Sequence, residues 1–194
     1  WQLGTVEDLT SKSKDGTVRA WGDLPEVLRG NRPGFPGVAP PIAVAGLEHV
    51  VHIAGGSHGF ALTADGRVFG WGHNGRGALG LGRVSNELLS PTEVPGLKDV
   101  VSIAVGAGAN AAVTRDGRVW TWGHNDQANL GDGGHADPGD PGQPTPAPVT
   151  GIGDAVEVKA GSYGRHLMVR RRNGTLIGWG NSDWGQLGAG ISGG

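Results

Sequence analysis

One eight-residue phrase occurs four times in this chain, and its spacing constrains the fold more than any other feature. The copies begin at Asp15, Asp65, Asp116 and Asn173, and each reads Asp/Asn-Gly-x-Val/Leu-x-x-Trp-Gly. Their starts lie roughly fifty residues apart, which is the period of a repeat architecture. The sequence therefore predicts four copies of one structural unit.

Each phrase marks a β-hairpin. An Asp-Gly or Asn-Gly pair is typical of a type I′ turn, in which both central residues have positive φ. Alternating residues on the two sides of the second Asp-Gly pair, at 60–63 and 68–71, predict two strands. Apolar runs upstream, at 50–54, 100–105 and 155–160, predict buried strands. One unit should thus hold a buried strand, a middle strand, a tight hairpin and a strand that ends in Trp-Gly.

A second shared phrase follows the three later Trp-Gly pairs, at 74–80, 125–131 and 181–188. It begins with Asn and ends in Leu-Gly. Its glycines favour a compact loop with positive φ, and its Leu is expected to reach the core. A proline-containing linker, such as 90–95, should lead to the next buried strand. The repeated tryptophans should pack between units: Trp21, Trp71, Trp122 and Trp179.

The two phrases, recurring in register, resemble the repeats of the regulator of chromosome condensation (RCC1) family over residues 15–188. The resemblance implies a β-propeller of small antiparallel sheets, usually with seven blades. We expect an all-β fold, a partial RCC1-like propeller of about four blades, the first of them degenerate. The units should lie near 15–46, 47–96, 97–150 and 151–194. A complete ring of the family would need nearly twice this chain.

Composition narrows the classes of partner. The chain has 194 residues with 16 basic and 18 acidic side chains, a net charge of −2 and no cysteine. Nucleic-acid binding relies on a broad face of clustered positive charge, and the chain offers only the local run 170–172 near a hairpin turn, so no nucleic-acid partner is predicted. Disulfides and thiolate metal sites are excluded. No membrane-spanning run and no signal peptide are visible, and the start at Trp1 indicates a processed or excerpted chain, so the compartment stays open.

Apparent catalytic and metal motifs do not survive alignment of the repeats. The segment 55–59 matches a G-x-S-x-G nucleophile elbow, but the equivalent positions of the other units lack its Ser-His pair and no helix follows. His73 and His124 occupy equivalent positions and should lie on one rim, where local hydrogen bonding is favoured over a metal site. The acidic insertion 131–140 fits neither an EF-hand nor a repeat-type calcium loop, and a loop in solvent is favoured. The chain is therefore predicted to be non-catalytic, with no cofactor and no metal.

The N-terminal segment 1–14 breaks the repeat pattern, since it offers no room for a buried strand and is polar next to the hairpin. One interpretation is that residues 1–4 are the remnant of a loop from a preceding unit. The alternative is a resemblance to a lasso peptide. In that case the Trp1 amine would form an isopeptide bond with Asp8, or with Glu7 in a smaller ring, and residues 10–14 would thread it.

The leading functional hypothesis is a scaffold that binds a protein or another ligand through rim loops at 74–82, 125–142 and 181–190. The alternative is a lasso-peptide-like product with the propeller as its tail. Self-association, or pairing with a missing half of the propeller, is also predicted, because half a ring exposes a blade face. The candidate binding residues are His73, Asn74, Arg76, His124, Asn125, Asp126, Asn181, Asp183 and Trp184.

Overall fold

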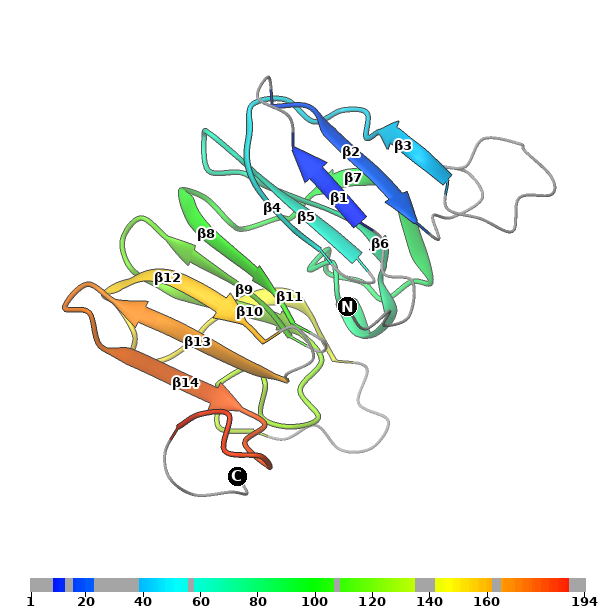
Figure 1. Ribbon diagram of the computed structural model, residues 1–194. Coiled ribbons are helices and arrows are strands. Elements are labelled where there is room, and N and C mark those ends of the chain that lie inside the picture. Colours follow the sequence, from blue (N-terminus) through cyan, green and yellow to red (C-terminus); the bar gives the residue numbers. More distant parts are fainter. Residues whose placement is uncertain are drawn as a thin grey trace.

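The structure, a computed structural model, describes residues 9–12, 16–22, 39–55, 58–106, 109–134, 142–161 and 165–188. These residues form four antiparallel sheets, which follow one another along the chain as the blades of a partial propeller (Figure 1). The described part contains no helix long and apolar enough to cross a membrane. The fold class predicted from the repeats is confirmed.

The four blades share one strand order. The first holds β1 (Leu9–Lys12), β2 (Val18–Gly22) and β3 (Ala39–Ala43), and the second holds β4 (Val50–Gly55), β5 (His58–Thr63), β6 (Val68–His73) and β7 (Glu87–Glu93). The third holds β8 (Val100–Val105), β9 (Ala109–Thr114), β10 (Val119–Gly123) and β11 (Gln143–Pro148). The fourth holds β12 (Ala155–Ala160), β13 (His166–Arg171) and β14 (Leu176–Gly180).

The N-terminal segment joins the first blade. Strand β1 pairs with β2 so that Leu9 lies opposite Trp21, as Gly59 lies opposite Trp71 in the second blade. Residues 9–12 therefore take the place that β5 holds in the second blade, here as an edge strand of a three-stranded sheet. The pairing gives no support to their interpretation as a thread. The predicted isopeptide residues Trp1, Glu7 and Asp8 lie outside the described residues.

Two segments predicted to be linkers are strands. Strands β7 and β11 form the outer edges of the second and third blades, and they contain Pro91 and Pro144. Proline cannot donate to a ladder, but an edge strand needs only one of its sides bonded. The prolines therefore mark the outer edge of a blade, and they also block pairing with another chain there.

The hairpin turns differ from the type I′ expectation. Gly66 and Gly117 have φ of 82° and 88°, whereas Asp65 and Asp116 are not among the residues with positive φ. Gly66 N donates to Thr63 O, which closes a three-residue loop of the type I plus glycine bulge kind. The hydroxyl of Thr63 donates to Asp65 Oδ1 at 2.6 Å, and this bond, more than the nearby Arg67, holds the pKa of Asp65 below its usual value.

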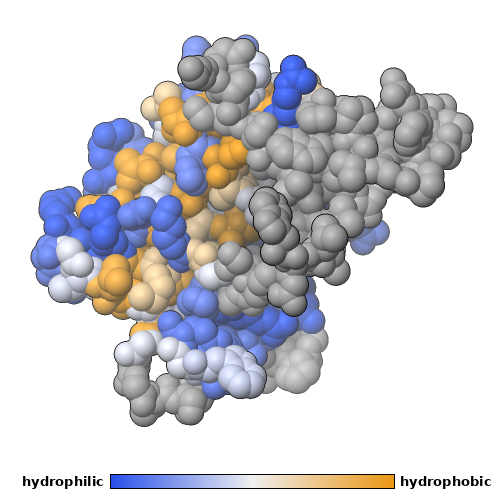
Figure 2. All heavy atoms as spheres, viewed as in Figure 1, coloured by the Kyte–Doolittle hydropathy of each residue, from blue (hydrophilic) through white to orange (hydrophobic). Residues whose placement is uncertain are grey.

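The hydrophobic core is divided into three clusters, each lying between two neighbouring blades. Leu79 and Leu130 of the second phrase are buried as predicted, and Trp71 and Trp122 are buried between blades. Phe60 of the second blade meets Trp122 of the third edge to face, with ring centroids 5.5 Å apart. Figure 2 shows hydrophobic residues gathered over the middle of the described part, bordered by hydrophilic residues on the left and below.

Candidate functional site

Three loops form one rim of the described arc, because each follows the Trp-Gly end of its blade. In the first two, a buried asparagine organises the loop. Asn74 Oδ1 accepts from Leu79 N at 2.9 Å, and Asn125 Oδ1 accepts from Leu130 N at 3.0 Å. Their amide groups donate to Ser85 Oγ and to the carboxylate of Asp132, respectively. Both predicted binding residues thus use their side chains inside their own loops.

The third loop has a register one residue different from the one predicted. Strand pairing places Gly180 opposite His166, as it places Gly72 opposite His58. Asn181 therefore occupies the position of His73 and His124, and Ser182 occupies that of the two organising asparagines. The Ser182 hydroxyl is too short for their role, and its oxygen is buried without a hydrogen-bond partner among the described residues.

A polar chain crosses the rim from the second blade to the fourth; we call Arg76, His124, Asp126 and Arg165 the rim cluster. Arg76 donates to His124 Nε2, and His124 Nδ1 lies 3.7 Å from Asp126 Oδ1. Arg165 Nη1 lies 2.5 Å from Asp126 Oδ2. Because a guanidinium can only donate, Nε2 of His124 is the acceptor in its bond with Arg76. The cluster brings together three predicted residues and one, Arg165, that no sequence pattern indicated.

The other candidates form local contacts. His73 Nδ1 accepts from Gly75 N at 3.3 Å, in agreement with the local hydrogen bonding predicted for it. Asn181 Nδ2 donates to Asp183 Oδ2 at 2.6 Å, and the neighbouring Trp184 is 89% exposed. Within the described ranges no three His, Asp or Glu side chains lie together as metal ligands would.

Beneath the rim, a buried network links the second and third blades. Asn110 Nδ2 donates to Ala78 O at 2.8 Å, which leaves its Oδ1 to accept from His58 Nε2, also at 2.8 Å. Trp122 Nε1 donates to the same Ala78 carbonyl at 3.0 Å. The first rim loop is thereby held to the third blade by two donors. The same bond recurs one blade on, where Trp179 Nε1 donates to Asn129 O at 2.9 Å.

Acidification should weaken the fold through His58. Burial lowers the pKa of this imidazole, an effect to which the nearby His73 adds and which the bond with Asn110 partly offsets. At pH values between the lowered pKa and the ordinary pKa of about 6.5, the unfolded chain binds more protons than the folded chain does. The free energy of unfolding therefore falls as the pH falls. Denaturant titrations at about pH 7.5 and pH 5 should show a larger loss for the wild type than for His58→Gln. Equal losses in the two proteins would contradict this role. Part of the pH dependence of stability that remains in His58→Gln should come from His52, whose pKa burial also lowers.

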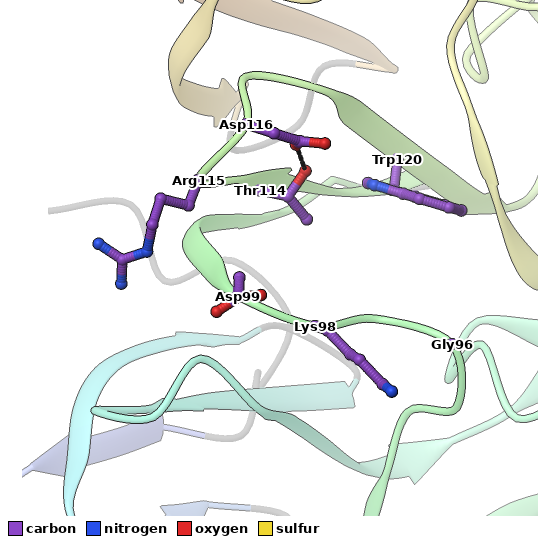
Figure 3. A pocket seen from close by; sticks show the side chains of 7 residues that line it. All are labelled: Gly96, Lys98, Asp99, Thr114, Arg115, Asp116 and Trp120. Carbon is purple, nitrogen blue, oxygen red and sulfur yellow. Dashed lines mark hydrogen bonds between the residues drawn. The ribbon is translucent and has the colours of Figure 1, made fainter.

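An open groove of about 480 Å³ lies at the opposite, hairpin end, on the third blade and the connection that leads into it (Figure 3). Lys98 and Asp99 line it from the β7–β8 connection, and Arg115 and Asp116 line it from a hairpin turn. Trp120 Nε1 is buried there without a partner among the described residues. Two cations and two carboxylates give the groove no dominant charge, so it favours no ligand of one sign.

Comparison with known proteins agrees with the repeat geometry. The model of the Regulator of chromosome condensation (RCC1) repeat matches residues 65–113 and 116–165, and a second RCC1 repeat model matches 100–128. The chain is 33% identical to the ultraviolet-B receptor UVR8 of Arabidopsis thaliana over 172 residues, which are 88% of the chain and 38% of the receptor. It is 36% identical to the mitochondrial RCC1 domain-containing protein RUG3 of the same plant, over 61% of the chain and 27% of that protein.

Solved structures share the fold. Prp20p of Saccharomyces cerevisiae superposes with a TM-score of 0.77 at 23% identity, over 98% of this chain and 49% of Prp20p. Human WBSCR16 superposes with a TM-score of 0.76 at 21% identity, over 98% of this chain and 51% of that one. The chain thus spans about half of these propellers and less of the curated relatives. With the repeat models covering half of its length and the same blades in space, the chain belongs to the RCC1 repeat family.

Proposed function

We propose that the chain is a non-catalytic scaffold that binds a protein partner through its rim. The observation that carries the proposal is the rim cluster, which joins charged side chains from three blades. The third loop of the same rim carries the exposed Trp184. Exposed arginines and an exposed indole on one rim are typical of protein-binding surfaces, where Arg and Trp are enriched. No nucleic-acid or membrane partner is proposed.

Relatives and the remaining charges support a protein partner. Yeast Prp20p has been characterised for binding to Gsp1p and histones and has been solved with Kap60 bound. Away from the rim, the arginines of the fourth hairpin are paired, since Arg170 lies 3.0 Å from Glu157 and Arg171 lies 2.7 Å from Asp154. These two hairpin arginines are thus already neutralised by carboxylates of their own blade.

Charge reversal on the rim tests the proposal. The double variant Arg76→Glu, Arg165→Glu should still fold, because exposed ion pairs add little stability. After crosslinking in a lysate, true partners should be recovered about tenfold less with this variant, and a purified partner should show the same loss of affinity. The matched control is Arg67→Glu, Arg118→Glu, which reverses two hairpin arginines at the other end. Equal recovery with the rim variant and the wild type would refute the proposal.

A further inference from the structure

The groove at the hairpin end of the third blade presents charged side chains that are not paired within the described part of the chain. Lys98, Asp99 and Arg115 line it and are exposed, and their side chains form no ion pair with another described residue. Asp116 differs from them, because its carboxylate lies 3.3 Å from Arg118 Nε. The groove therefore offers free charges of both signs to a ligand.

The backbone frame of the groove recurs in the second and fourth blades, but with other side chains. In all three blades an amide of the hairpin turn donates to a carbonyl of the preceding connection, in the pairs Ala64–His49, Arg115–Asp99 and Arg172–Asp154. In the fourth blade Asp154 is neutralised, because it lies 2.7 Å from Arg171 Nε. Thr114 takes the place of Arg171 in the third blade, and the second blade has the uncharged Ala64 in its turn. Free charges of both signs are thus specific to the third blade among these three.

An aromatic side chain forms one wall of the groove. Trp120 holds the strand position of Phe69, as the pairing of β10 with β9 and of β6 with β5 shows. In the second blade the guanidinium of Arg67 lies over the Phe69 ring, 5.4 Å from its centroid. No described cation stacks on the partly exposed Trp120 in this way, and its indole lies across the groove from Arg115 (Figure 3). An indole without a stacked cation thus stands beside the free charges.

We propose that this groove binds a segment of a protein partner in which acidic and basic side chains lie close together. The acidic side chain would pair with Lys98 and Arg115, and the basic one with Asp99. The aliphatic stem of a long side chain would pack on the Trp120 indole. Small-molecule sites enclose most of their ligand, whereas this groove of about 480 Å³ is open and suits a length of chain. The site lies at the end opposite the rim, and it goes beyond the proposed rim function without depending on it.

Three synthetic octapeptides test the proposal; they repeat the units Glu-Lys, Glu-Gln and Gln-Lys. Each peptide is titrated into the 194-residue chain, and the indole N–H signal of Trp120 is followed by NMR after assignment with Trp120→Phe. The Glu-Lys peptide should shift this signal in a saturable way. The other two peptides should bind at least about tenfold more weakly, because each leaves one sign of charge in the groove unpaired. An unmoved signal with the Glu-Lys peptide, or equal binding by a peptide of one sign, overturns the proposal.

Variants of the exposed charged side chains assign the contacts. Asn tolerates the φ of 52° that Asp99 adopts, so Asp99→Asn should fold and lose the preference for the Glu-Lys peptide over the Glu-Gln peptide. The double variant Lys98→Gln, Arg115→Gln should lose the preference over the Gln-Lys peptide. Glu48→Gln is the matched control at the equivalent position of the second blade, and it should leave all three affinities unchanged. A preference that persists in either groove variant places the peptide elsewhere and refutes the site.

Discussion

Replacing Trp122 with alanine is expected to lower the free energy of unfolding by about 4 kcal/mol, within the range measured for large aromatic truncations in cores. The side chain is 1% exposed and lies between the second and third blades. Its removal deletes the edge-to-face contact with Phe60 and the hydrogen bond to Ala78 O. Chemical denaturation followed by circular dichroism measures the loss.

Trp122→Phe separates the two contributions. It keeps an aromatic ring in the cavity but removes the indole donor, while Asn110 Nδ2 still satisfies the Ala78 carbonyl. The smaller ring and the lost bond should together cost roughly 2 kcal/mol, about half the effect of alanine. A Trp122→Ala protein as stable as the wild type would show that the blades are not held together by this residue.

The second large effect is expected at the glycine of the hairpin phrase. Gly117→Ala should destabilise the protein by about 3 kcal/mol: roughly 1 from a positive φ and roughly 2 from overlap with the backbone of the next blade. The φ of Gly117 is 88°, and the added Cβ would lie 2.5 Å from Gly153 O. Backbone cannot move aside as the end of a flexible side chain can, and Ala155 N donates to Gly117 O at the same junction.

Gly174→Ala is the matched control. Gly174 has a φ of 87° in the equivalent turn of the fourth blade, and nothing lies within 4 Å of the added Cβ. It should cost only about 1 kcal/mol, the part due to φ alone. Similar losses at the two sites would mean that contact between blades adds nothing to the requirement for glycine.

The repeat phrase predicted what depends on local sequence. Asp-Gly located the hairpins, alternation located the strands, and the equivalence of His73 with His124 placed both on one rim. The turn type was wrong because a single glycine with positive φ is enough when the loop holds three residues. The outer strands β7 and β11 were read as linkers because their prolines hide a pairing that involves only one side.

The binding side of the molecule was only partly accessible from sequence. Asn181 was aligned with Asn74 on residue type, although it follows the Trp-Gly glycine directly whereas Asn74 stands two residues after it. The pairing of His166 with Gly180 confirms the shift of one residue. Arg165 follows no motif, and it joins the rim because β13 begins beside the loop that carries Asp126. Contacts between units bring together residues some forty positions apart in sequence, and no local pattern encodes them.

The three core clusters lie between blades, and this placement determines how the molecule comes apart. A blade has little apolar interior of its own, so its stability comes from contacts with the neighbouring blades, as in a one-dimensional array of repeats. The second and third blades have two neighbours each, whereas the fourth has one described neighbour. Unfolding should therefore fray inward from the fourth blade, and amides of β13 and β14 should exchange with solvent before those of β5 and β9.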